Sequence, residues 1–160
     1  MNQLILAIIF SVLPIFELRG GLPIALDYAI KNNFPIWLVF LTIILTNIFV
    51  IFLLFFFLDF LHSGFMKLKI YRKTFNFFLK RTRKKADNIE RKMKVYGFLA
   101  LTLFVAIPLP VTGVWTGTLI AWLLDLDRKK SILAISLGVL IAGIIVLLAY
   151  FGIISFIKLV

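Results

Sequence analysis

The chain has 160 residues, of which 62% are hydrophobic, and a formal net charge of +11 at pH 7. Soluble domains are nearer half apolar, so this composition predicts one polytopic membrane domain. The absence of cysteine excludes disulfides, thiolate metal sites and a cysteine nucleophile, and the single histidine, His62, excludes a histidine cluster. No metal, no cofactor and no enzyme activity is expected.

The apolar segments follow a short, short, long order that occurs twice. Segments 4–16 and 22–30 flank "ELRGG", and segment 35–58 follows without a charged residue. Segments 95–107 and 119–124 flank "PLPVTGVWTG", and segment 131–157 is again long and uncharged. Thirteen helical residues reach only about 20 Å, whereas the hydrocarbon core of a bilayer is roughly 30 Å thick. Each short pair is therefore either a re-entrant hairpin or one broken spanning helix.

The distribution of charge favours the re-entrant interpretation. Twelve Lys and Arg residues and only two acidic residues lie in residues 67–94, and such a segment is expected to be cytoplasmic. Re-entrant pairs also place Arg128, Lys129 and Lys130 on the cytoplasmic side, whereas crossing pairs place them outside. The first hairpin then enters from the external face and the second from the cytoplasmic face.

An internal sequence similarity supports the interpretation that the chain has two related halves. Four residues of the first half match residues of the second half at a constant offset of 96: Pro14, Gly21, Ile24 and Ala25 correspond to Pro110, Gly117, Ile120 and Ala121. Inverted repeats with interrupted helices are typical of secondary transporters. The predicted fold is an all-α integral membrane protein with two inverted re-entrant helical hairpins, two long transmembrane helices and one cytoplasmic amphipathic helix.

The single domain of residues 1–160 divides into residues 1–62, 63–96 and 97–160. The first and last parts each contain a hairpin and a span. The protein is expected to cross the cell (plasma or inner) membrane several times, with residues 66–94 in the cytoplasm. Proline removes backbone donors and glycine allows close backbone approach, so both predict the turns at the hairpin tips. The expected tip residues are Pro14, Gly20, Gly21, Pro23, Pro108, Pro110, Gly113 and Gly117.

Glu17 and Arg19 are the only charged pair inside a hydrophobic block. Ionisable residues at membrane depth are costly and usually mark a pathway, a relay or a counter-ion pair. Burial favours the protonated form of a carboxyl group, so Glu17 is a candidate proton or cation site. Arg19 has the planar fork that binds a phosphate or carboxylate. The alternative is that the two side chains only neutralise each other and fix the hairpin.

Four further polar side chains are candidates for ion or substrate binding. Thr112, Trp115 and Thr116 either cap freed backbone groups of the second break or line a cavity opposite Glu17. Asp27 either faces the same cavity or lies at the membrane interface near Lys31. Asn47, within the first long span, is interpreted as an interhelical contact.

The basic segment has apolar residues at spacings of three and four between residues 68 and 96, which predicts an amphipathic helix. Beside a membrane span, such a helix is expected to lie on anionic lipid head groups. It either anchors the topology or gathers anionic lipid as a substrate, and no nucleic-acid partner is expected. A cavity between two hairpins is small for one protomer, so a homodimer is a further possibility.

The motifs "PIFELRGGLPIAL" and "IPLPVTGVWTGTLIA" resemble the family of small multidrug export proteins, and more distantly the DedA superfamily of membrane proteins. The DedA resemblance implies two re-entrant hairpins of inverted orientation and a role in lipid scrambling, polyprenyl-phosphate transport or proton-coupled transport. DedA members carry arginines in the second hairpin, whereas this chain has none between Lys94 and Arg128. A phosphate-binding role would therefore depend on Arg19 alone.

The leading hypothesis is a small membrane transporter or exporter, coupled to protons or cations, that moves a small molecule or anionic lipid between the hairpins. The first alternative is a translocase or scramblase for anionic or polyprenyl-phosphate lipids. The second alternative is a membrane assembly factor that transports nothing.

Overall fold

The computed structural model describes residues 3–65, 90–109 and 112–159, and the regular secondary structure of this part of the chain is all α-helix. Its helices are α1 (Gln3–Val12), α2 (Glu17–Lys31), α3 (Ile36–Phe65), α5 (Glu90–Ala106), α6 (Val114–Leu123) and α7 (Arg128–Leu159). At 1.5 Å per residue, α3 and α7 are about 45 Å long, whereas α1 and α6 are only about 15 Å long. The predicted alternation of short and long helices is therefore present.

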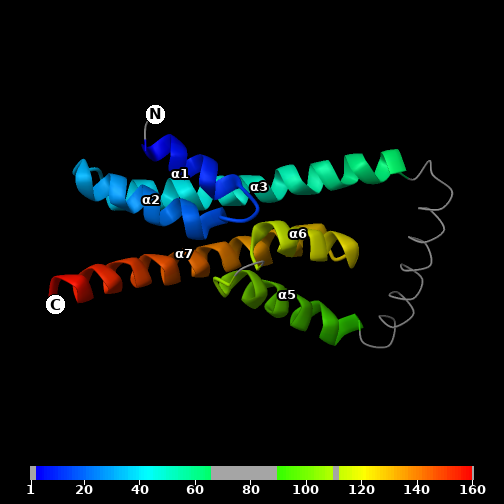
Figure 1. The fold of residues 1–160 in the computed structure, drawn as a ribbon. Coiled ribbons are helices and arrows are strands. Elements are labelled where there is room, and N and C mark those ends of the chain that lie inside the picture. Colours follow the sequence, from blue (N-terminus) through cyan, green and yellow to red (C-terminus); the bar gives the residue numbers. More distant parts are fainter. Residues whose placement is uncertain (1–2, 66–89, 110–111, 160) are drawn as a thin grey trace.

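The short helices form two antiparallel hairpins beside the long pair (Figure 1). The turn between α1 and α2 and the loop between α5 and α6 are both directed toward the middle of the molecule, from opposite ends. The long helices α3 and α7 run antiparallel to each other. The middle of the molecule is thus the place where the two hairpin tips meet.

The first turn is shorter than the sequence predicted. Helix α1 ends at Val12, because Pro14 disfavours a helical conformation for Leu13. Only residues 13–16 separate the two arms, and the Glu17 N–H already donates to the Leu13 carbonyl at 2.9 Å. The expectation that "ELRGG" forms the tip is wrong, because those residues form the first turn of α2.

The expected tip glycines Gly20 and Gly21 are helical, and so is Pro23. Gly21 is needed for close contact between the arms, since a Cβ atom there would lie 2.6 Å from the Ala7 carbonyl oxygen. Pro23 has no N–H to donate to the carbonyl of Arg19, so α2 lacks the backbone hydrogen bond between these two residues.

The second break covers residues 107–113 and includes Pro108 and Gly113, whereas Pro110 lies outside the described residues. Gly117 is a helical residue of α6 and not part of the loop. A Cβ atom at Gly117 would lie 2.7 Å from Cγ2 of Val105, on the preceding arm α5. Gly21 and Gly117 therefore both allow the second arm of a hairpin to approach the first.

Most of the amphipathic helix expected in the basic segment lies outside the described residues. Residues 90–96 belong to α5, which continues without interruption to Ala106. The boundary expected between residues 96 and 97 is therefore not a helix end.

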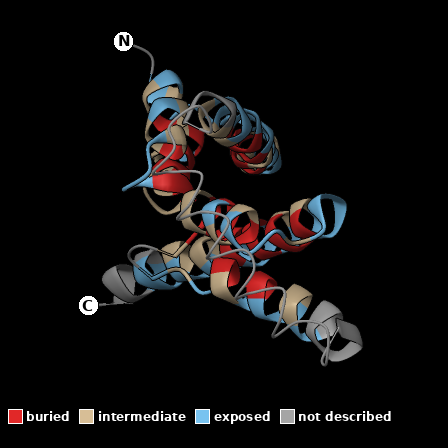
Figure 2. Cartoon of the chain, turned by 90° about the vertical axis from the view of Figure 1, so that its right-hand side faces the viewer, coloured by how far each residue is buried: buried red, intermediate tan, exposed pale blue. Residues whose placement is uncertain are grey.

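The core lies where the helices face one another and consists of aliphatic side chains together with Phe55. The largest fully buried ones are Leu22, Leu26, Ile43, Ile51 and Ile135. Buried residues lie on the sides of the helices that face one another, and outward sides are exposed (Figure 2). Outward sides are nevertheless apolar: Phe49, Phe56 and Leu148 are all more than 60% exposed.

Two helices are long and apolar enough to cross a membrane, Ile36–His62 and Arg128–Ile153, and less than half of each is buried. Two hydroxyl groups on α3 are satisfied within the helix, since the Thr42 hydroxyl donates to the Leu38 carbonyl and the Thr46 hydroxyl to the Thr42 carbonyl. Gly143 of α7 lies close to Ile44 of α3, as small residues commonly do between membrane helices. Exposed apolar sides on helices, whose backbone groups bond within the helix, suit a hydrocarbon environment.

Candidate functional site

The two hairpin tips are joined at the Glu17 carboxylate. Its Oε1 atom accepts a hydrogen bond from the Trp115 backbone N–H at 3.1 Å, and its Oε2 atom lies 3.2 Å from Arg19 Nη2. Trp115 is the second residue of α6, so the carboxylate lies at a helix N-terminus, where unpaired N–H groups favour negative charge. Glu17 is only 5% exposed, and its charge is balanced by a guanidinium and a helix terminus.

Gly113 is the residue that lets the carboxylate approach. Its φ is 155° and its ψ is −157°, a region occupied essentially only by glycine. A Cβ atom at this position would overlap the Glu17 carboxylate. Glu17 itself has a φ of 48°, which is uncommon for a residue with a side chain. Both residues thus adopt special backbone conformations where the tips meet.

Trp115 makes a second bond across the tips through its indole ring. The Nε1–H donates to the carbonyl of Val12 at 3.0 Å. Val12 is the last residue of α1, so its carbonyl has no donor from a following helical turn. Trp115 of the second hairpin therefore binds both arms of the first, at Val12 in α1 and at Glu17 in α2.

A cavity of about 10 Å³ lies beside this contact and has space for about one water molecule. Its polar lining consists of Glu17 and Arg19 from α2 and Asn47 from α3, and its other walls are contributed by α5, α6 and α7. Asn47 is 1% exposed and donates through Nδ2 to the Ile43 carbonyl at 2.9 Å. No other residue in the described part of the chain hydrogen-bonds its Oδ1 atom.

Asn47 was not predicted as a site residue. The sequence signal was present, since it is the one strongly polar residue of the first long span. The sequence does not show which side of α3 faces the hairpin tips.

Of the other predicted site residues, Asp27 lies away from the carboxylate, and Thr112 and Thr116 have partners in the loop before α6. Asp27 forms an exposed ion pair with Lys31 at 2.7 Å, about 15 Å along α2 from Glu17. That hydrogen bond and the charge of the Asp27 carboxylate raise the pKa of Lys31. The Thr112 hydroxyl lies 2.7 Å from the Ile107 carbonyl oxygen, so it closes its own loop. Thr116 Oγ1 lies 3.5 Å from the Gly113 carbonyl oxygen.

A second polar cluster lies where α3 ends and α7 begins. Asp59 accepts a hydrogen bond from the Trp122 indole at 2.9 Å and pairs with Arg128 at 2.6 Å. The Arg128 guanidinium lies 4.9 Å from the centre of the Phe55 ring, within reach of a cation–π contact. Both side chains of the Asp59–Arg128 pair are about half exposed, in contrast to the Glu17 site.

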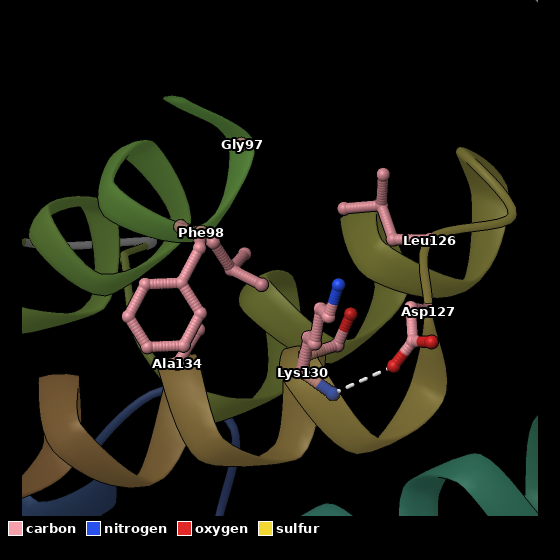
Figure 3. Close-up of a pocket in the computed structure, with 8 residues that line it drawn as sticks. Gly97, Phe98, Leu126, Asp127, Lys130 and Ala134 are labelled. Carbon is pink, nitrogen blue, oxygen red and sulfur yellow. Dashed lines mark hydrogen bonds between the residues drawn. The ribbon is translucent and has the colours of Figure 1, made fainter. Parts of the chain in front are cut away.

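A larger cavity of about 60 Å³ lies between α5 and the start of α7 (Figure 3). Its charged lining is Asp127 and Lys130, and Figure 3 shows the carboxylate of Asp127 bonded to the backbone N–H of Lys130. Asp127 thereby caps the N-terminus of α7. The Asp127 carboxylate is thus used to bond the first turn of α7. None of the predicted site residues lines this cavity.

Two helices long and apolar enough to span a membrane, with exposed apolar sides, indicate an α-helical membrane protein. Within that class, the sequence matches the family model described as "Putative small multi-drug export protein" over residues 17–145. The chain belongs to this family, which confirms the resemblance seen in its two motifs. Searches among curated proteins and among solved structures gave no significant match.

Proposed function

We propose that the protein is a small secondary transporter whose site lies between two re-entrant hairpins. The observation that carries this proposal is the partly buried Glu17–Arg19 pair beside a cavity at the meeting point of both tips. A charged pair at membrane depth is costly and is usually retained for a pathway or relay. Membership of an export family supports the same function.

Helix lengths support the re-entrant arrangement. Helix α1 has 10 residues and α2 has 15, so the arms reach about 15 and 22 Å, which is less than the roughly 30 Å core. The second hairpin has apolar arms Tyr96–Ala106 and Val114–Leu123, which are equally short. Irregular backbone at membrane depth is tolerated where it packs against protein, as Glu17 and Gly113 do where the tips meet.

The positive-inside rule supports an orientation in the cell membrane. The end of the molecule that holds Asp59 and Arg128 would be cytoplasmic, together with the basic residues 67–94. Lys31 and Asp27 would then lie at the external end. The first hairpin would enter from outside and the second from inside.

Contacts between equivalent residues support an inverted repeat. At the offset of 96, Glu17 corresponds to Gly113, and these two residues touch each other. Residues near a pseudo-two-fold axis are expected to meet their own counterparts. Gly21 and Gly117, another corresponding pair, both pack against the first arm of their own hairpin.

In the proposed mechanism, Glu17 takes up and releases the coupling proton, and Arg19 binds an anionic group or sets the charge state of Glu17. The test uses purified protein in proteoliposomes with an internal pH-sensitive dye and a panel of organic anions and cations. Substrate-dependent proton movement is expected for the wild type and for Asp27→Asn, which removes an exposed carboxylate of the same helix. Loss of this movement is expected for Glu17→Gln. Dye signals that match empty liposomes for every compound would contradict the transporter proposal.

The arrangement in the membrane has its own test, because the chain has no native cysteine. Single cysteines at Asn33, between α2 and α3, and at Lys129, at the start of α7, are both exposed. Re-entrant hairpins place them on opposite faces, and crossing pairs place them on the same face. Labelling of both from one side by an impermeant maleimide would exclude the re-entrant hairpins.

A lipid translocase is the second candidate, and exposure at the first tip favours it. Ile15 is 83% exposed and Arg19 side-chain atoms are 22% exposed, so a lipid tail can remain outside while its head group approaches Arg19. Flipping of a fluorescent anionic phospholipid without any ion gradient, lost in Glu17→Gln, would favour this candidate over coupled transport.

A further inference from the structure

We infer that the Glu17 carboxylate fills an anion-binding site formed by the two hairpin tips. When Glu17 is protonated, an oxyanion of the substrate takes the place of the carboxylate. This inference rests on the proposed transport function and deepens it. The substrate class that it names is a molecule with a monoanionic phosphate or carboxylate group.

The first argument is the composition of the site that Glu17 occupies. One carboxylate oxygen is bound by a backbone N–H at the start of α6 and the other by a guanidinium. A glycine with no room for a Cβ atom, Gly113, forms the floor under the carboxylate. An arginine, a helix N-terminus and a close glycine together form the kind of site that binds phosphate and carboxylate groups.

The second argument is the unused donor capacity of Arg19. A guanidinium carries five N–H donors, and the one hydrogen bond of Arg19 within the described part of the chain goes to Glu17. Its side chain is 22% exposed, whereas the Glu17 side chain is 7% exposed. Arg19 therefore connects the buried site with the surface, and an arriving oxyanion would meet it first.

The third argument is the place available to a protonated Glu17. Asn47 lines the same cavity, is 1% exposed, and has an Oδ1 atom with no donor among the described residues. A carboxylate cannot donate to that oxygen, but a carboxylic acid can. Asn47 Oδ1 therefore offers an acceptor across the same cavity that only the protonated form of Glu17 can use.

Apart from Glu17 and Arg19, no titratable residue is among the described residues that line the cavity. The lining residues from α3, α5, α6 and α7 are Asn47, Val105, Gly113, Val114, Val139 and Ala142, and none of them titrates. The nearest part of α1 contributes the Val12 carbonyl, which already accepts the Trp115 indole N–H. Arg19 is the one charged neighbour in the described lining.

The coupling follows from charge balance. With Glu17 ionised, Arg19 has its counter-ion and the site is filled. Protonation removes the negative charge, and the neutral carboxyl group turns to Asn47. The substrate oxyanion then replaces the charge beside Arg19, so one proton and one negative charge enter together and the net movement is electroneutral.

The experiment measures equilibrium binding of dimethyl phosphate to the purified full chain in detergent between pH 5 and pH 8. This diester keeps one negative charge throughout, so any pH dependence belongs to the protein. Wild-type affinity should rise as the pH falls, approaching tenfold per pH unit while the protonated fraction is small. Glu17→Gln, which imitates the protonated form, should bind at least tenfold more tightly at pH 8 and show no pH dependence.

Three variants and a second ligand complete the test. Arg19→Gln should abolish binding, and Asn47→Leu should shift the rise in wild-type affinity to lower pH, whereas Asp27→Asn should bind as the wild type does. Short-chain phosphatidylglycerol carries the same phosphodiester on a lipid. Binding of both ligands indicates recognition of the free group, and binding of the lipid alone identifies a lipid head group as its source.

The outcomes separate this inference from the proposed function. Weaker binding in folded Glu17→Gln, or wild-type affinity that falls or stays constant as the pH falls, would overturn the inference. If neither ligand binds although substrate-driven proton movement still requires Glu17, the inference fails and the transporter remains. If proton movement is also absent, the proposed function fails.

Discussion

The two hairpins have similar shapes but contribute different chemistry to the site. The first, α1–α2, supplies a carboxylate and a guanidinium. The second, α5–α6, has no charged side chain in residues 96–123 and supplies a glycine, a backbone N–H and an indole N–H. Each hairpin therefore lacks what the other provides.

The difference follows from the contact between equivalent positions. If the second half carried a carboxylate where Gly113 lies, two negative charges would meet in a buried space, and one would have to be protonated. Glycine at one of the two positions removes both the charge and the side-chain volume. Two related halves that meet at their own equivalent residues must therefore differ there.

The largest effect is expected from Gly113→Ala, which breaks the contact. Its backbone conformation alone costs about 1–3 kcal/mol for a residue with a side chain, and the new Cβ atom displaces the Glu17 carboxylate. Thermal unfolding in detergent should show a large drop in the transition temperature. Gly152→Ala is the matched control, because nothing lies within 4 Å of a Cβ atom there. Equal melting of both variants would show that the tips do not meet in this way.

The next effect compares the two hairpins directly. A Cβ atom at Gly21 would press on the backbone of α1, at 2.6 Å from the Ala7 carbonyl oxygen, whereas one at Gly117 meets the side chain of Val105. Backbone yields less readily than a side chain, so Gly21→Ala should destabilise by about 1–3 kcal/mol and Gly117→Ala by less. Melting curves of the two variants test the order. A reversed order would mean that the second hairpin is packed more tightly.

A smaller effect is expected from Trp115→Phe, which sharpens the comparison by removing one bond across the tips. The backbone N–H to Glu17 remains, and only the indole bond to Val12 is lost. A loss of about 1 kcal/mol in unfolding free energy is expected. Trp37→Phe, at a side chain that is 66% exposed, serves as the control and should change stability little.

The smallest effects are expected outside the tips, at exposed ion pairs. Asp59→Asn removes the charge that faces Arg128, and Asp27→Asn removes the charge that faces Lys31. Exposed pairs contribute about 0–1 kcal/mol and weaken with salt. Unfolding at low and high ionic strength should give small differences that shrink with salt. A large effect of either variant would remove the contrast between the Glu17–Arg19 pair at the tips and the two exposed ion pairs.

The sequence by itself determined the class, the family and the order of the helices. Runs without charge dictate long helices, and prolines and glycines dictate where helices are interrupted. It did not determine the exact turn, because "RGG" is compatible with a loop and with a helix packed closely against a neighbour. The contact of Gly21 with α1 decided for the helix.

Only the tertiary structure decided how Glu17 is held. Its partner Trp115 is 98 positions away, and the bond uses a backbone N–H that every residue except proline carries. No residue type marks such a donor in a sequence. The Trp115 N–H can bind Glu17 only because it lies at the start of α6 and faces the other tip. Asn47 likewise became part of the site only when the packing of α3 turned it toward the cavity. Local patterns set the elements, and long-range packing set which polar groups meet.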